Sequence, residues 1–246
     1  MIRSYGRFRA GAEYFIWQGA SCRAYDITML SFPSRTSPAI YGTSTAISGR
    51  NGDLWSSDNT KQTYELSVSC SARQSKLNAA VHWLKGSGEL IFSSSPNEAI
   101  KARIAEAIQI QRKSNDRDPL CEFEVKFTCQ PFLYVRPAAA NITITSSNTA
   151  VTNPCTAASA PVIKIAGSGD FDVMIGQQIV TLTGVSGGGI ILNSELLDAF
   201  TYDGSELAND KMTGDFFMLN PGTQYVAWSP AASVTSIVIT PNWRNE

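Results

Sequence analysis

The sequence predicts a mainly β protein with one or two short helices, divided into two domains. Three observations point to this fold class. Short segments that alternate between apolar and polar residues recur along the 246-residue chain, and turn-forming pairs such as Asn-Gly, Asp-Gly and Pro-Gly lie between them. Only 17% of the residues are charged, against roughly 25% in typical globular chains. This composition argues against disorder and against a helical bundle with a charged surface.

Four segments of the first half are expected to be strands: 13–19, 24–31, 63–71 and 122–129. The last two alternate strictly, which is typical of strands with one buried face. Pro131 is expected to end the fourth strand, because proline cannot donate to a sheet. The pair Asn51-Gly52 tolerates positive φ angles and predicts a hairpin turn.

One segment of the first half has a helical period. Its apolar residues follow one another at intervals of three and four: Leu77, Ala80, Val81 and Leu84. Gly86, after the last turn, is a stop signal for the helix. These residues predict an amphipathic helix over 74–85. Residues 97–113 fit a helix and a strand equally well, since their isoleucines satisfy both periods, and periodicity does not decide between them.

The second half reads almost entirely as short strands separated by glycine-rich turns. The expected strands are 141–145, 162–165, 171–175, 179–183, 189–192, 224–229 and 234–240. Turn signals at this spacing are typical of an antiparallel sandwich, here of about 100 residues.

Charge and composition both change near Pro137. Residues 1–136 hold 17 Lys/Arg and 12 Asp/Glu, a net charge of +5, whereas 137–246 hold 3 and 9, a net charge of −6. A tract rich in alanine, serine, threonine and asparagine follows Pro137. We therefore predict domains at 1–136 and 137–246, with 241–246 as a segment that could pack back on the first domain.

The residue inventory argues against catalysis, cofactors and metals. The single histidine, His82, lies off the apolar stripe of the expected helix, with no serine or cysteine motif around it. Five scattered cysteines without a Cys-x-x-Cys pair are typical of free thiols. The acidic residues between Asp198 and Asp215 follow no calcium-loop pattern. No apolar window is long enough for membrane insertion, and a net charge of −1 provides no general field for nucleic acid.

Ordered motifs over nearly the whole chain resemble the distal tail protein (Dit) family of long-tailed bacteriophages. In the first half they are Ser48-Gly-Arg-Asn-Gly-Asp-Leu54, the strand Tyr64 to Cys70, His82-Trp-Leu84, Gly88-Glu-Leu-Ile-Phe92 and Phe123 to Tyr134. In the second half they are Pro161 to Ile165, Ile190 to Glu195, Gly214-Asp-Phe216, Leu219 to Gly222 and Ile237 to Arg244. The start of the chain departs from the family, with Trp17-Gln-Gly19 where Asn-Gly is more usual, and Ser48 replaces a common proline.

The resemblance implies a structural role without enzyme activity. Six N-terminal domains would form a ring that joins the tail tube to the baseplate and receptor-binding apparatus and lets DNA pass through. The C-terminal domain would be a galectin-like β-sandwich. Implied partners are the tail tube, tape measure, tail-associated tip and receptor-binding proteins. The implied location is the distal end of the tail in the virion, after assembly in the host cytoplasm. The family pattern also favours a strand over 101–111.

The expected oligomer interface includes Gly49, Arg50, Asn51 and Gly52. Exposed strands of the first domain could be completed by a neighbouring subunit, since an unpaired sheet edge accepts a further strand. The basic residues of this half could line the channel of a ring or form ion pairs between subunits, and we favour the second reading.

The alternative function is a carbohydrate-binding module for attachment to the host surface. Sugars stack on aromatic faces, and Tyr225, Trp228 and Trp243 are the candidate contacts. Galectin-type sites also use a histidine and arginines, whereas residues 137–246 contain no histidine and only Arg244. A third alternative, a cell-wall hydrolase, would need a carboxylate pair in an aromatic cleft, and no such cleft is evident in the sequence.

Overall fold

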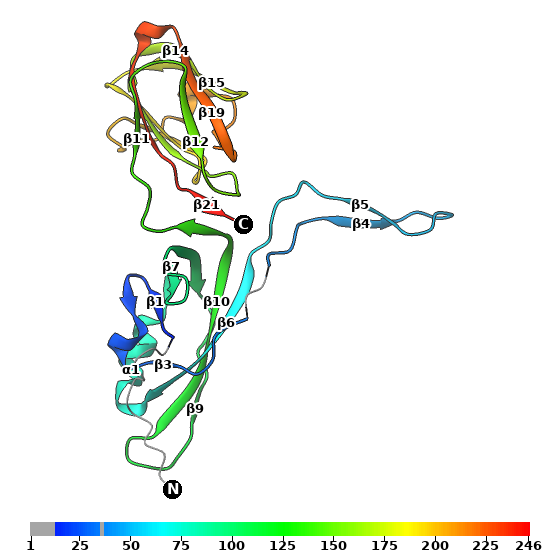
Figure 1. Ribbon diagram of the computed structural model, residues 1–246, viewed down its shortest axis with the longest axis vertical. Coiled ribbons are helices and arrows are strands. Elements are labelled where there is room, and N and C mark those ends of the chain that lie inside the picture. Colours follow the sequence, from blue (N-terminus) through cyan, green and yellow to red (C-terminus); the bar gives the residue numbers. More distant parts are fainter. Residues whose placement is uncertain (1–12, 35–36) are drawn as a thin grey trace. The chain divides into compact units, whose positions relative to one another are not determined.

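The computed structural model describes residues 13–34 and 37–246 of the chain and is mainly β (Figure 1). The chain forms two compact units, one ending at Leu133 and one running from Tyr134 to Glu246. The assignment of ring-forming and galectin-like roles to two domains divided at 136/137 stays a prediction.

The first unit is built on one antiparallel sheet with the strand order β2-β1-β7-β8-β10-β6-β3, and β9 also pairs with β10. The strands are β1 (Phe15–Trp17), β2 (Ala20–Ser21), β3 (Thr28–Met29), β6 (Tyr64–Arg73), β7 (Gly86–Phe92), β8 (Glu98–Ile104), β9 (Ile110–Arg112) and β10 (Leu120–Val135). A separate two-stranded sheet consists of β4 (Thr43–Ala46) and β5 (Asp53–Ser56).

The alternating segments became strands as predicted. On β6, Leu66, Val68 and Cys70 are buried and pair with the inward-facing residues of β10. The ambiguous segment 97–113 forms the two strands β8 and β9. The expected strand over 24–31 is wrong in part, because the short 3-10 helix η1 (Cys22–Tyr25) occupies its start and only Thr28–Met29 is extended.

Pro131 does not end its strand, as the sequence suggested, since β10 continues to Val135. Its pairing with β6 stops at Cys129, which lies opposite Tyr64. The proline therefore lies where β6 no longer requires a donor, and the extended backbone continues without a lost bond to that strand.

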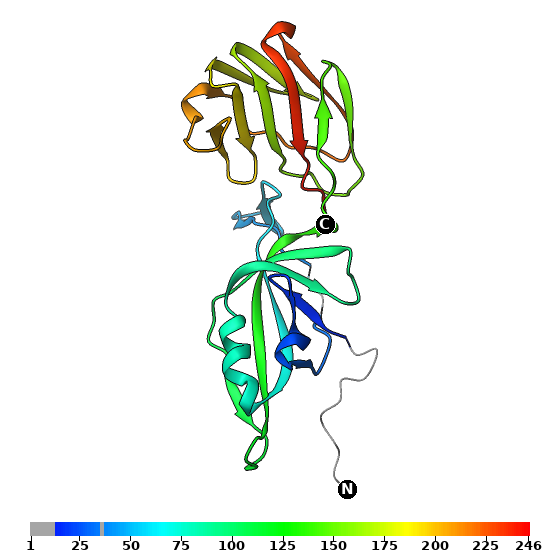
Figure 2. The same cartoon turned by 90° about the vertical axis from the view of Figure 1, so that its left-hand side faces the viewer.

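The predicted helix is α1 (Gln74–Trp83), which lies along the sheet of the first unit (Figure 2). Leu77, Ala80 and Leu84 of its apolar stripe are buried, and His82 is exposed. Phe15 stacks on Trp83 with ring centroids 5.9 Å apart, and Tyr25 stacks on the same indole at 4.4 Å. The helix thus closes an aromatic core that begins at β1.

The second unit is a sandwich of two five-stranded antiparallel sheets, as predicted. One has the order β11-β20-β13-β16-β17 and the other the order β12-β19-β14-β15-β18. Their strands are β11 (Ile142–Ile144), β12 (Thr149–Asn153), β13 (Val162–Gly167), β14 (Gly169–Ile175), β15 (Gln178–Val185), β16 (Gly189–Asn193), β17 (Asp198–Thr201), β18 (Met212–Thr213), β19 (Gly222–Ser229) and β20 (Val234–Thr240). The 3-10 turns η2 (Asn209–Lys211) and η3 (Ala231–Ser233) join them.

The end of the chain is held within this second unit. Trp243 is buried in the sandwich core, and its carbonyl accepts a hydrogen bond from the N–H of Val135 at 3.0 Å. The following strand β21 (Arg244–Asn245) pairs with β10, and the Arg244 Nε donates to the carbonyl of Ala158 at 2.6 Å. The packing of 241–246 on the first domain stays a prediction.

Candidate interface on the β4–β5 hairpin

The hairpin formed by β4 and β5 is exposed along its whole length. Within the described part of the chain the two strands pair only with each other, in a register that places Thr43 opposite Ser56 and Ala46 opposite Asp53. Every residue from 39 to 56 is exposed, and Figure 1 draws the hairpin apart from the nine-stranded sheet. An isolated two-stranded ribbon is marginally stable in water, because it has neither a third strand nor a packed layer against which to bury its side chains.

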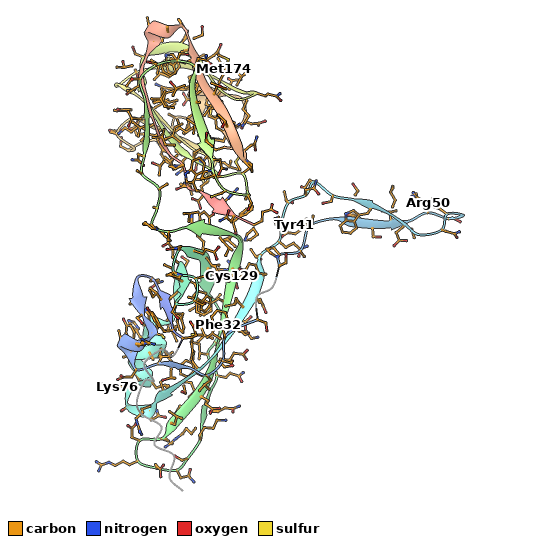
Figure 3. All side chains as sticks on the ribbon, in the orientation of Figure 1. Phe32, Tyr41, Arg50, Lys76, Cys129 and Met174 are labelled. Carbon is orange, nitrogen blue, oxygen red and sulfur yellow. The ribbon has the colours of Figure 1, made fainter. Side chains whose placement is uncertain are left out.

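The predicted turn lies at the far tip of this hairpin, where Figure 3 labels Arg50. Its geometry is not the two-residue turn expected from Asn51-Gly52. The loop spans residues 47–52, the N–H of Arg50 donates to the carbonyl of Ile47 at 3.1 Å, and the positive φ angles belong to Gly49 (83°) and Gly52 (77°). Asparagine tolerates positive φ, but here two glycines supply it without steric cost.

Large apolar side chains are concentrated on the hairpin, and no element among residues 13–34 and 37–246 covers them. Their exposed fractions range from 44% to 59%, for Ile40, Tyr41, Ile47, Leu54 and Trp55. Single exposed apolar residues are ordinary on protein surfaces, whereas several large ones on one element indicate an interaction surface. We call these five residues the apolar arm set.

Trp55 has the largest exposed fraction of this set, and the backbone beside it is shaped to fit its ring. A Cβ atom on Gly42 would lie 2.1 Å from Cζ2 of Trp55, so only glycine permits the indole to rest on the main chain there. Ser44 lies opposite Trp55 in the register, and its hydroxyl donates diagonally across the ribbon to Asp53 at 2.7 Å. The hairpin therefore holds a rigid aromatic side chain in place while leaving 59% of it exposed.

The base of the hairpin is fixed by main-chain bonds and by a hydrogen-bonded carboxylate. Tyr41 donates its N–H to the carbonyl of Thr60 at 2.8 Å, and Gln62 donates to Ala39 at 2.7 Å. The hydroxyl and N–H of Thr60 both donate to Asp58, at 2.6 and 2.9 Å, and they hold the pKa of that carboxyl below its usual value. Asp58 consequently keeps its charge in mildly acidic solution.

A small apolar hollow of about 110 Å³ lies where the chain leads into and out of the hairpin. Pro33 before the hairpin and Tyr64 after it both line this hollow, together with Leu66, Leu90, Ile100 and Leu133. Phe32 lies at its rim, half exposed, with its ring centroid 5.2 Å from that of Phe92. Exposed apolar groups thus occur both on the hairpin and at its base, where Phe32 and the hollow lie.

The three candidate sugar contacts of the second unit do not lie together on one surface. Tyr225 and Trp228 come from the same strand, β19, but point to opposite faces of the sheet. Tyr225 is 56% exposed, whereas Trp228 and Trp243 are buried in the sandwich core, where their rings are closed to a ligand from solution.

The described residues contain no group of three or more His, Cys, Asp or Glu side chains that could hold a metal ion. The five cysteines are free thiols, and burial raises the pKa of Cys129 to about 12. None of the helices in the described part of the chain has the length and apolarity needed to cross a membrane.

Comparison with known proteins gives a match in fold. The chain matches no family model and no curated protein by sequence. Its structure is similar to the Dit protein of phage SPP1, described as a paradigm of the hub adsorption apparatus in phages that infect Gram-positive bacteria, with a TM-score of 0.71, 16% identity, and coverage of 93% of this chain and 98% of that one. A chain of the activated phage p2 baseplate gives a TM-score of 0.49, 7% identity and the same coverage. The similarity to the SPP1 protein confirms the expected Dit fold.

Proposed function

We propose that this protein is a structural subunit of a phage tail tip. Six copies would form a ring through their first units, join the tail tube to the baseplate and receptor-binding apparatus, and leave a central passage for DNA. The observation that carries the proposal is the shared fold with the SPP1 hub protein, which extends through both units of the chain. A structural role is also consistent with the exposed apolar side chains of the hairpin.

The β4–β5 hairpin supplies a physical route to such a ring. If the hairpin of one subunit covers a different surface on the next, the contact is heterologous, and repetition of one rotation closes a ring. The apolar arm set would be buried in each contact, and the loop with Gly49, Arg50, Asn51 and Gly52 would extend farthest over the neighbour. We also propose that the basic excess of the first half forms ion pairs at these contacts.

The remaining partners follow from the position of such a ring. One face would contact the tail tube and tape measure proteins, and the other the tail-associated tip and receptor-binding proteins. The protein would be assembled in the host cytoplasm, would reside at the distal end of the tail, and would meet DNA only in transit. It would need neither a cofactor nor insertion into a membrane.

Mass and shape in solution test the proposal directly. Sedimentation velocity and native mass spectrometry of the full chain should show a species of about 160 kDa, six times the 26.6 kDa of one chain. Negative-stain images of that species should show rings with a central opening. A chain that stays monomeric at high concentration, and that does not bind to tails lacking their tip, would refute the proposal.

A further inference from the structure

The three most exposed large apolar side chains among residues 13–34 and 37–246 lie at one edge of the second unit. Leu197 is 64% exposed, Leu207 is 63% exposed and Leu196 is 61% exposed. Leu196 and Leu197 belong to the turn between β16 and β17, where Oδ1 of Asn193 accepts hydrogen bonds from the N–H groups of Glu195 and Leu196 at 3.1 and 3.2 Å. The turn is therefore held by its own backbone, while its two leucines stay in water.

An apolar row crosses the outer face of the sheet beside this turn. Leu207 pairs with Phe200 on β17, and Phe200 pairs with Ile191 on β16. Leu192 and Ala199, the next residues along the two strands, are buried in the sandwich core, so alternation directs Ile191 and Phe200 to the outer face. Several large apolar side chains at one edge indicate an interaction surface. We call the following residues the leucine face: Ile191, Leu196, Leu197, Phe200 and Leu207.

Each leucine of this face has a carboxylate as its direct neighbour in the chain. Glu195 precedes Leu196, Asp198 follows Leu197 and Glu206 precedes Leu207. Between residues 195 and 210 the chain has five acidic residues and neither lysine nor arginine: Glu195, Asp198, Asp203, Glu206 and Asp210. The leucine face is therefore bordered by negative charge.

Two lysines near this region contact other groups. Lys164 pairs with Ile191 across the sheet, and its Nζ lies 4.1 Å from the centroid of the Tyr202 ring. Lys211 donates from its Nζ to the carbonyl of Gly184 at 3.0 Å. Five carboxylates and two lysines leave a net charge of −3, and the local potential favours a positively charged ligand.

The chain itself contains a segment of the opposite character. Residues 1–12 lie outside the described residues, and their sequence is Met-Ile-Arg-Ser-Tyr-Gly-Arg-Phe-Arg-Ala-Gly-Ala. This segment has three arginines and no acidic residue, and its large apolar side chains recur at every third residue, at Ile2, Tyr5 and Phe8. Arginine pairs with carboxylates through a planar group with several donors. Twelve residues span at most about 40 Å, which lets the segment contact another molecule.

We propose that the leucine face binds the N-terminal segment, residues 1–12, of a second copy of this chain. Ile2, Tyr5 and Phe8 pack on the exposed leucines, and the arginines pair with the carboxylates around them. This contact joins the first unit of one copy to the second unit of another and is separate from the hairpin contact of the proposed ring. Within such a ring, the high effective concentration of the tethered segment would strengthen it.

Titration with a synthetic peptide of residues 1–12 tests the site. The receptor is the full chain with Arg3→Glu, Arg7→Glu and Arg9→Glu, because these changes prevent its own segment from competing. Calorimetry should show binding of the peptide. The affinity should fall at least about fivefold between roughly 0.05 and 0.5 M NaCl, because salt screens exposed charges.

Two variants of this receptor test the leucine face. Leu197→Asn should weaken binding at least about tenfold by removing an apolar contact, and asparagine fits the φ of 58° at this residue. Glu206→Lys should weaken it at least about fivefold. The matched controls, Ile179→Ala on the other sheet and Asp116→Lys in the first unit, should bind as the receptor does. If the peptide does not bind, or if both face variants bind it equally well, the proposal is wrong.

Photocross-linking identifies the copy that supplies the segment. An unlabelled full chain with p-benzoylphenylalanine in place of Phe8 is mixed with isotope-labelled chain that lacks this group. Irradiation should join the unlabelled segment to labelled peptides from residues 191–207, as mass spectrometry would show. Cross-links only within one chain, or only to other surfaces, would refute binding by a second copy. A chain that forms rings without binding the peptide would overturn this inference alone, and a monomeric chain that binds it would overturn only the proposed ring.

Discussion

Replacement of Trp55 by alanine tests the role of the β4–β5 hairpin in assembly. The side chain is 59% exposed in the single chain, so that a contact which covered it would remove about 150 Å² from water, taking a tryptophan as roughly 250 Å². At about 25 cal/mol per Å², this area contributes about 3–4 kcal/mol to each subunit contact. A loss of that size lowers the association constant of each contact by more than about 100-fold.

The assay is sedimentation velocity over a range of concentrations. Trp55→Ala should shift the distribution from the ring toward monomers, and its thermal unfolding should change little, because the indole contributes no core contact to the nine-stranded sheet. Ile179→Ala is the matched control, since it also removes a largely exposed apolar side chain, but from the second unit. If Trp55→Ala assembles at the same concentrations as the original chain, the hairpin does not make the ring contact, and the reasoning from its exposure fails.

Three further predictions concern stability. Burial raises the Cys129 pKa from 9.0 to about 12, so the unfolded chain loses this proton at a lower pH than the folded chain. The contribution of Cys129 to the free energy of unfolding should therefore be constant below pH 9 and be lost between pH 9 and 12, and urea titrations should show a smaller fall over this range in Cys129→Ala. Gly189→Ala should destabilise the second unit by about 2–4 kcal/mol, because the new Cβ would lie 1.9 Å from the Ile165 carbonyl oxygen. Gly187→Ala is the control: its Cβ would meet no atom within 4 Å, and the same calorimetric scan should show a loss of about 1 kcal/mol. Asn153→Ala leaves the carbonyls that the buried amide binds, at 2.8 and 3.0 Å, without their donor, and equilibrium unfolding should show a loss of about 2–3 kcal/mol; a loss below 0.5 kcal/mol would contradict this account.

Strands were predictable from sequence where one face is buried. In β6 and β10 apolar and polar residues alternate because one face of each strand packs on the core. The strands of the sandwich are bounded by turns that contain glycine. The strand Thr149–Asn153 escaped prediction because its polar composition resembles a loop, although Val151 and Asn153 face inward. The prediction that Pro131 ends its strand was wrong for a related reason. A sequence does not show where the pairing between two strands stops, and beyond that point a proline can stand in extended backbone.

The surface sites were harder to predict, because residue type does not state exposure. Tyr225 and Trp228 are both aromatic, yet alternation along β19 places one outside and the other in the core. That period was present in the sequence and could have separated them. The hairpin turn was predicted, but no local pattern encodes that none of the other described strands pairs with this ribbon.

The exposed ribbon of β4 and β5 has a kinetic consequence for assembly. Since few tertiary contacts hold it in the free subunit, capture by a neighbour would order the ribbon further, and the entropy lost in that step lowers the affinity gained per unit of area. Early, incomplete oligomers would then dissociate readily, and errors in their construction could be reversed. Only the last subunit would bind two neighbours at once, and because its dissociation would break two contacts, the closed annulus would be long-lived.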